Sequence, residues 1–153
     1  MQQYSWIKRG GIEVSGIGAF QFRTFDQGMR LAIDVGVGAK YVGGPVSIEA
    51  SPQISIGANK RGEGNKELID VPLHVAFHAT PKLAIFVDSG ITGQASAFDA
   101  TYVVPVGVGA ALAVLPNLDV GAEFALPNAV TGMEGDNSTD LRVLGVFASY
   151  RTK

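Results

Sequence analysis

Apolar residues recur at every second position through most of the chain, and this period restricts the fold more than any other feature. In the stretch 29–41, Ile33 and Val35 flank Asp34, and the same alternation resumes over 46–59 after a Gly-Gly-Pro turn. A side-chain period of two is that of a β-strand, and a tight turn between two such runs forms a hairpin. The pattern therefore predicts a sheet with one uncharged face and one charged face.

Eight segments of the chain share this alternation, and the chain shows no amphipathic helical pattern. We predict an all-β fold, an eight-stranded antiparallel up-and-down β-barrel that spans a membrane, in one domain over residues 1–153. Tight, proline-bearing links alternate with longer polar links, so the two ends of the sheet should differ. The expected strands cover approximately residues 11–23, 28–41, 46–59, 68–78, 82–92, 98–114, 117–126 and 140–150.

Composition excludes several classes of protein. Hydrophobic residues make up 46% of the chain and charged residues 17%, below the roughly 25% of soluble domains. The net charge of −2 and the lack of a basic stripe argue against a nucleic-acid partner. Cysteine is absent, so disulfides and thiolate metal sites are excluded.

A soluble β-sandwich is the main structural alternative, because its strands also alternate. The charged face, however, is rich in Gly and Ala, which suits a narrow barrel interior better than a solvated surface. Pro52, Pro72 and Pro105 count against uninterrupted strands, and each should need a bulge or a local break. Aromatic residues fall near the expected strand ends, as in the interfacial belts of membrane barrels. The expected interface aromatics are Phe20, Phe22, Tyr41, Phe77, Phe98, Tyr102, Phe124 and Phe147.

In these features the chain resembles the small eight-stranded outer-membrane barrels of bacteria. The resemblance covers roughly residues 11–150 and rests on the alternation and the links, not on a signature motif. Such barrels often end in an aromatic residue, whereas here Phe147 and Tyr150 precede Arg151-Thr152-Lys153. The resemblance implies a monomer in the bacterial outer membrane, with the lipid bilayer as partner and no cofactor.

The charged face carries the candidate site residues. Eight strands leave an interior just wide enough for side chains, so we expect a filled polar lumen with a structural role, or a surface-interaction role through the external loops. A narrow cation-selective pore is the alternative function, because acids outnumber bases on this face. The expected luminal charge network consists of Glu13, Arg30, Asp34, Glu49, Asp70, His74, Asp88, Asp99, Glu123 and Arg142.

Metal binding and catalysis find little support in the sequence. Along one strand, His74 and His78 would lie about 13 Å apart, too far to share a metal ion. No Ser lies beside either His in the sequence, so we expect no catalytic residues and no enzyme. A lipid-modifying outer-membrane enzyme that used Ser and His across strands is the further alternative.

Overall fold

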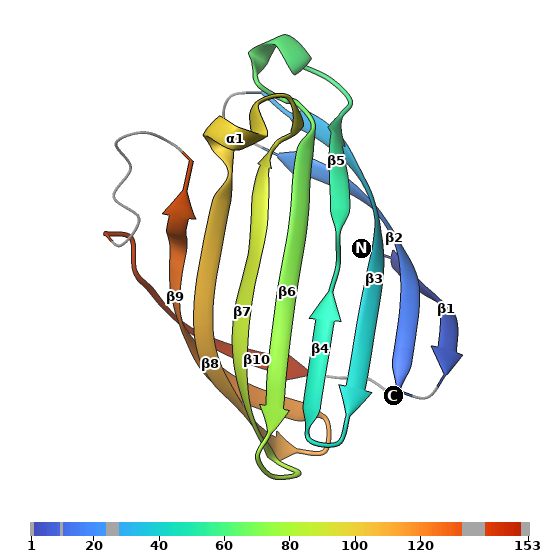
Figure 1. Ribbon diagram of the computed structural model, residues 1–153, viewed down its shortest axis with the longest axis vertical. Helices are drawn as coiled ribbons and strands as arrows, with labels where there is room; N and C mark the ends of the chain where they lie inside the picture. The colour runs from blue at the N-terminus through green and yellow to red at the C-terminus, as the bar shows by residue number, and fades with distance from the viewer. Residues whose placement is uncertain (1, 10, 24–27, 133–139, 151–153) are drawn as a thin grey trace.

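The computed structural model describes residues 2–9, 11–23, 28–132 and 140–150, without the side chains of 2–9 and 23. These residues form one antiparallel sheet, which confirms the all-β prediction (Figure 1). Short helical turns, η1 (Arg61–Glu63), η2 (Ala95–Ala97) and α1 (Phe98–Thr101), lie in the links at one end. The strands are β1 (Gln2–Arg9), β2 (Ile12–Arg23), β3 (Arg30–Gly43), β4 (Val46–Ala50), β5 (Gln53–Gly57), β6 (Leu68–His78), β7 (Leu83–Gln94), β8 (Val103–Leu115), β9 (Leu118–Thr131) and β10 (Val143–Tyr150).

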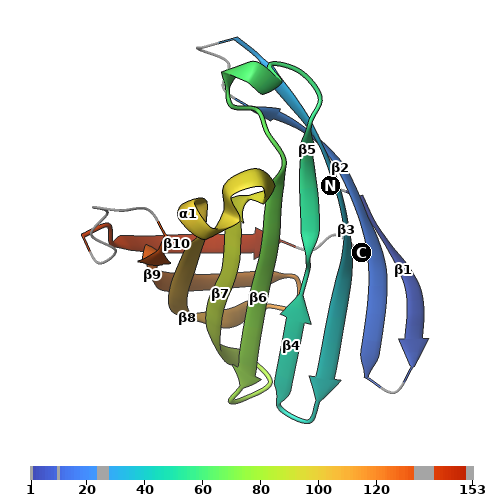
Figure 2. The same ribbon diagram turned by 45° about the horizontal axis from the view of Figure 1, so that its top comes forward.

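The strands follow one another in an up-and-down order. The order across the sheet is β1-β2-β3-β4-β6-β7-β8-β9-β10, and β5 continues β4 between β3 and β6. The sheet curls strongly, so that β10 lies behind β6 in the view of Figure 1 and crosses the other strands at a steep angle in Figure 2. Within the described residues, β1 and β10 are the two ends of the sheet, and neither pairs with the other.

The strand count and several expected boundaries were wrong. The ten strand segments occupy nine positions instead of eight, because β1 adds a strand before the first one predicted. Residues 98–101 form the helical turn α1 instead of the start of a strand. The hydroxyl of Thr101 closes that turn, because it donates to the carbonyl of Ala97 and accepts from the N–H of Gln94. The strand expected over 117–126 continues to Thr131, and residues 133–139 of the following loop lie outside the described part of the chain.

Pro52 and Pro72 lie where the sheet is interrupted. Pro52 separates β4 from β5, and its carbonyl accepts a hydrogen bond of 3.0 Å from the N–H of Val37. A Cβ on Gly36 would lie 2.4 Å from that same carbonyl oxygen, and one on Gly90 would lie 2.9 Å from the Cα of Pro72. Each proline therefore needs a glycine on the neighbouring strand, where the chains approach more closely than a side chain allows.

Pro105 is accommodated by a bulge. On β8, Val104 pairs with Val130 and Val106 pairs with Leu126, so the single residue Pro105 faces three residues of β9. The extra residues of β9 form a bulge, so no hydrogen bond across the β8–β9 pair requires the N–H that Pro105 lacks. The prediction that the prolines need bulges or breaks is confirmed at Pro52 and Pro105, whereas β6 runs unbroken through Pro72, which faces the break between β4 and β5.

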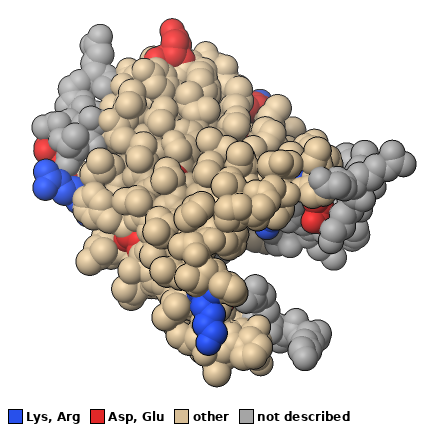
Figure 3. Space-filling view, turned by 60° about the horizontal axis from the view of Figure 1, so that its bottom comes forward, with Lys and Arg blue, Asp and Glu red and all other residues tan. Residues whose placement is uncertain are grey.

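The two faces of the sheet have an inverted pattern of burial. On the convex face Val35 is 57% exposed and Val108 is 50% exposed, whereas Asp34 on the concave face is only 2% exposed. Figure 3 shows a broad surface with very few charged side chains. The described residues form a single layer, and no second layer covers the apolar face. Soluble domains arrange these residues in the opposite way, with large apolar side chains covered and charges in water.

The helical turns of the described residues are short. None of them has the length and the apolar character that a membrane-spanning helix requires.

Candidate functional site on the concave face

A row of charged residues crosses the concave face at right angles to the strands. Backbone pairing places Glu13 opposite Lys40, Lys40 opposite Glu49, Glu49 opposite His74, and His74 opposite Asp88. Charge therefore alternates across five neighbouring positions of the sheet if His74 is protonated. Directly opposed residues of opposite charge each contribute roughly 0.2–1 kcal/mol to sheet pairing. We call this set the charge row.

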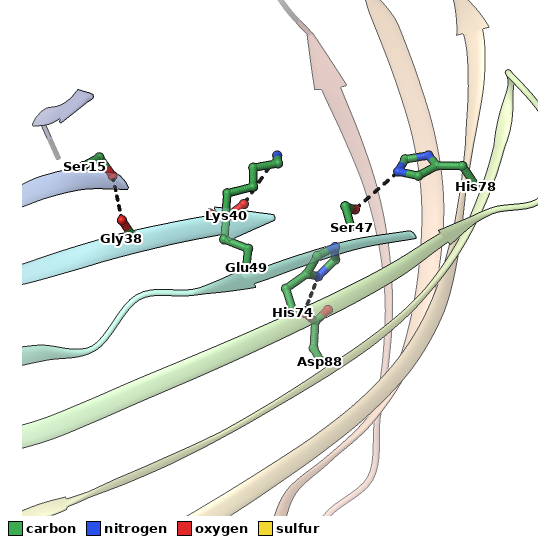
Figure 4. Close-up of polar contacts among 8 residues, drawn as sticks. All are labelled: Ser15, Gly38, Lys40, Ser47, Glu49, His74, His78 and Asp88. Carbon is green, nitrogen blue, oxygen red and sulfur yellow. Dashed lines mark hydrogen bonds and ion pairs between the residues drawn. The ribbon is translucent and has the colours of Figure 1, made fainter. Parts of the chain in front are cut away.

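Two contacts within the charge row are close in the structure. His74 Nδ1 lies 2.6 Å from Asp88 Oδ1, and Lys40 Nζ lies 3.5 Å from Glu49 Oε2 (Figure 4). The Lys40 and Glu49 side chains are 47% and 40% exposed, so solvent weakens their attraction and the pair adds little stability. The charge row therefore contributes more to fixing the register of the strands than to the stability of the fold.

Ser47 and His78 form a separate pair next to the charge row. The Ser47 hydroxyl lies 3.3 Å from His78 Nε2, and Ser47 is buried. Among the described residues, the serine contacts one histidine and the carboxylate of Asp88 contacts the other. Hydroxyl, imidazole and carboxylate are thus not joined into the three-residue relay that a serine hydrolase uses.

Two phenylalanines project into the same region. The Phe86 ring lies 5.4 Å from the ring of His74 and 6.1 Å from that of Phe147. Each ring covers a glycine of a neighbouring strand: a Cβ on Gly109 or on Gly121 would lie 2.3 Å from the Cζ of Phe86 or Phe147, respectively. Glycine at these positions is what allows the rings to lie flat against the backbone.

Together these side chains line a cavity of about 550 Å³ on the concave side of the sheet. Its polar wall comes from Ser47, His78 and all members of the charge row except Glu13, and its apolar wall comes from Phe86 and Phe147. Glu123 also faces the cavity, where its carboxylate leans over Gly107. Three carboxylates and one lysine line this space, so its charge favours cations over anions.

The predicted charge network is only partly assembled in one place. Glu49, His74, Asp88 and Glu123 line the cavity, and Glu13 lies at the end of the charge row. Nearer the loop end, Asp70 accepts a hydrogen bond of 2.9 Å from Gln53. Four further members of the network, Arg30, Asp34, Asp99 and Arg142, lie apart from the cavity and have different surroundings.

Asp34 is the most deeply buried charged residue among those described. Its Oδ1 atom and the Nε atom of Arg30 are both buried without a hydrogen-bond partner in the structure. Burying an unpaired polar atom costs free energy, so a water molecule or another group is needed at these positions.

Asp99 and Arg142 lie outside the strands, which corrects their predicted placement. Asp99 is exposed on α1, and Arg142 is exposed just before β10 begins at Val143. Neither residue lies in the cavity. Both residues fit the alternating pattern of the sequence, but the structure places Asp99 in a helical turn and Arg142 in a loop.

Four of the expected interface aromatics lie exposed near strand ends on the convex face: Phe20, Phe22, Tyr41 and Phe77. Three others differ from the expectation in position or contacts. Phe124 is exposed on that face but lies in the middle of β9, because β9 is longer than predicted. Phe98 and Tyr102 stack on each other at 6.3 Å in the turn that follows β7.

Phe147 was assigned to the wrong face. It pairs with Gly121, whose neighbours Asp119 and Glu123 belong to the polar face, and it lines the cavity. On β10 the most exposed apolar residues are instead Leu144 and Val146. The sequence signal was ambiguous, because apolar residues occupy both phases of this strand.

The sequence pattern did not identify Ser47 and Phe86 as cavity residues. A pairing register would have identified Ser47, since it lies opposite Ala76 in the sheet. Phe86 could have been recognised as the one large aromatic residue in the polar phase of its strand.

The loop between β5 and β6 is held against the start of β3 by two asparagines. Asn65 is 3% exposed, and its Nδ2 donates to the carbonyls of Leu31 and Asn59 at 2.8 Å and 2.7 Å. The side chain of Asn59 accepts from the N–H of Leu31 at 2.8 Å and donates to the carbonyl of Met29. This loop is therefore an ordered surface that continues the hydrogen bonding of the sheet.

We expect the contact between Glu67 and Arg61, which closes this loop, to weaken in acid. The pKa of Glu67 lies below its usual value, because its carboxylate accepts a hydrogen bond from its own backbone N–H and another from Arg61. A lowered pKa means that the contact is complete at neutral pH and is lost as the pH falls through the folded-state pKa, below 4.5. Hydrogen exchange of the loop amides, corrected for intrinsic rates, should rise over that range. Glu67→Gln should abolish this pH dependence, and an unchanged dependence in the variant would contradict the assignment.

The described residues contain no group of three or more His, Cys, Asp or Glu that could hold a metal ion. The expectations of no cofactor and no enzymatic activity stay predictions.

Comparisons with known proteins add no relationship. No family model, curated protein or solved structure matches this chain. The resemblance to outer-membrane barrels therefore stays a prediction that rests on the pattern of residues and on the burial of the two faces.

Proposed function

We propose that this protein is an integral β-barrel-type protein of the bacterial outer membrane. Its convex face contacts lipid hydrocarbon, and its concave face encloses a filled polar interior. Its role is structural, or consists of surface interactions through the ordered loops at one end. Its partner is the lipid bilayer, and the interior takes no cofactor.

The inverted burial of the two faces carries this proposal. Large apolar side chains lie exposed along β2 to β10, whereas Ser15, Asp34, Ser47 and Ser55 are buried. Large apolar patches of this extent are unfavourable in water and favourable in hydrocarbon. The strands of 11 to 14 residues, β2, β3 and β6 to β9, are also long enough to cross a bilayer when tilted.

The side chains in the cavity favour a filled interior over a cation-selective pore. Phe86 and Phe147 occupy the same space as the carboxylates, and Phe86 is 7% exposed. Bulky aromatic rings block a narrow conducting path, and an eight- to ten-stranded barrel has little further width to offer.

Folding with and without detergent tests the proposal. We expect the chain to aggregate in plain buffer and to fold in detergent micelles, with electrophoretic migration that changes on boiling. A monodisperse, folded monomer in plain buffer would reject the membrane assignment and favour a soluble β protein. Steady single-channel conductance in a planar bilayer, abolished by Asp88→Asn, would instead support the pore.

A further inference from the structure

The two edges of the sheet run in the same direction. Nine strand positions are joined by eight antiparallel pairings, from the β1–β2 pair to the β9–β10 pair. Eight successive reversals leave β10 parallel to β1. A direct β1–β10 pairing would therefore be parallel, in a sheet whose every other pairing is antiparallel, and parallel pairs are slightly less stable per residue.

One added strand resolves this mismatch. A strand that runs opposite to β1 also runs opposite to β10, so it can form antiparallel ladders with both edges at once. The result has ten positions, and single-chain bacterial outer-membrane barrels have even numbers of strands. We propose that the opening between β1 and β10 binds one β-strand of a partner polypeptide, which completes the barrel by strand addition. This inference rests on the proposed membrane function.

A second copy of this chain does not supply that strand. Copies inserted in one membrane have the same orientation, so their free edges β1 and β10 all run in the same direction. Any edge-to-edge pairing between such copies is parallel, as in the direct closure. A second copy in the same membrane is therefore excluded as the source of the added strand.

The neighbouring residues define the chemistry of the added strand. The charge row extends to β1, because the backbone register places Lys8 opposite Glu13. The next residue in the row, beyond Lys8, should be acidic, since opposed like charges destabilise a sheet. On the other edge Leu144 and Val146 are 77% and 84% exposed, more than most apolar residues of the sheet. The partner strand should therefore alternate apolar residues with small polar ones and carry one Glu or Asp among the polar set.

A synthetic strand provides the probe. We would add a peptide of about eleven residues, which spans a bilayer when tilted, to the full chain folded in detergent micelles. The peptide alternates apolar residues with Ser and Thr and carries one Glu. A peptide of the same composition with a scrambled order is its control. Trp6 is the single tryptophan of the chain and lies in β1, so its fluorescence reports on that edge.

We expect the peptide to slow amide exchange in both β1 and β10 and to shift the emission of Trp6, while the scrambled peptide does neither. Lys8→Glu should weaken binding roughly three- to tenfold, and a peptide with Lys in place of Glu should restore it. Lys82→Glu, on an exposed turn away from both edges, is the matched charge control and should leave binding unchanged. If Lys8→Glu does not fold, the native chain tests the same charge preference: it should bind the peptide with Lys more weakly than the peptide with Glu.

Several results would overturn the inference. Slow exchange of β10 before peptide is added, with fast exchange throughout β1, would show that β10 pairs with β2 and displaces β1. Protection at one edge only, or equal effects of the scrambled peptide, would reject a bridging strand. A disulfide-linked dimer of a Val146→Cys variant, formed in high yield in micelles, would show that β10 pairs with a second copy. If the chain folds without detergent, the proposed function fails, whereas the peptide test can still be run in buffer.

Discussion

Replacing Val108 by arginine should lower the free energy of unfolding of the membrane-inserted protein by about 2–4 kcal/mol. Val108 lies near the middle of β8 on the convex face and is 50% exposed. Its cross-strand neighbours Val87 and Phe124 are also exposed, so the arginine would lie within a wide apolar surface. A charge at this depth must enter hydrocarbon or distort the bilayer around it. Urea titration of the protein in lipid vesicles measures the loss.

Ser96→Arg is the matched control for this substitution. Ser96 is exposed in η2, beyond the end of β7, so the same charge there should change the free energy of unfolding by less than about 0.5 kcal/mol. If Val108→Arg has no larger effect than Ser96→Arg, then the convex face lies in water and the membrane account is wrong.

Phe86→Ala should destabilise the protein by about 3–5 kcal/mol, the usual cost of removing a buried aromatic ring. The Phe86 ring is packed between His74 and Phe147 and covers Gly109. Its loss removes these contacts and leaves a void in the interior that the curved backbone cannot readily close. Equilibrium unfolding in detergent, followed by circular dichroism, measures the change.

Phe20→Ala removes the same ring atoms from an exposed site and serves as the control. Phe20 is 78% exposed on β2, so its replacement should cost less than half as much as the loss of Phe86. Equal losses at the two positions would mean that Phe86 does not pack in an interior. In addition, Gly109→Ala should be destabilising by itself, because its Cβ would meet the Phe86 ring, and less so when combined with Phe86→Leu.

Alternation of side chains was enough to predict most of the sheet. Seven of the eight predicted strands match strands β2 to β7, β9 and β10, because a residue's face follows directly from its parity. Six of them start within about two residues of the observed strand, and the strand predicted over 140–150 contains β10. The separation of Val35 from Asp34 onto opposite faces was predicted in the same way and agrees with their burial. The interruptions at the prolines followed from the missing N–H of that residue.

The sequence pattern failed where parity carries no information. β1 has no apolar phase, and a bulge between Ser5 and Ile7 interrupts its alternation, so it was not recognised as a strand. α1 is too short for a helical period to show. Pairing register relates residues far apart in the chain, so the charge row and the contact of His74 with Asp88 could not be deduced from either strand alone.

A cysteine scan of β8 in lipid vesicles tests the central claim most directly. The native chain has no cysteine, so each variant carries one label. We would attach a small fluorophore and measure its quenching by lipids brominated on their acyl chains. Labels at Val106, Val108, Ala110 and Leu112 should be strongly quenched, and labels at Ala111 and Ala113 weakly, so that quenching alternates with a period of two. Weak quenching at all six positions, or stronger quenching at Ala111 and Ala113, would contradict a hydrocarbon-facing convex surface.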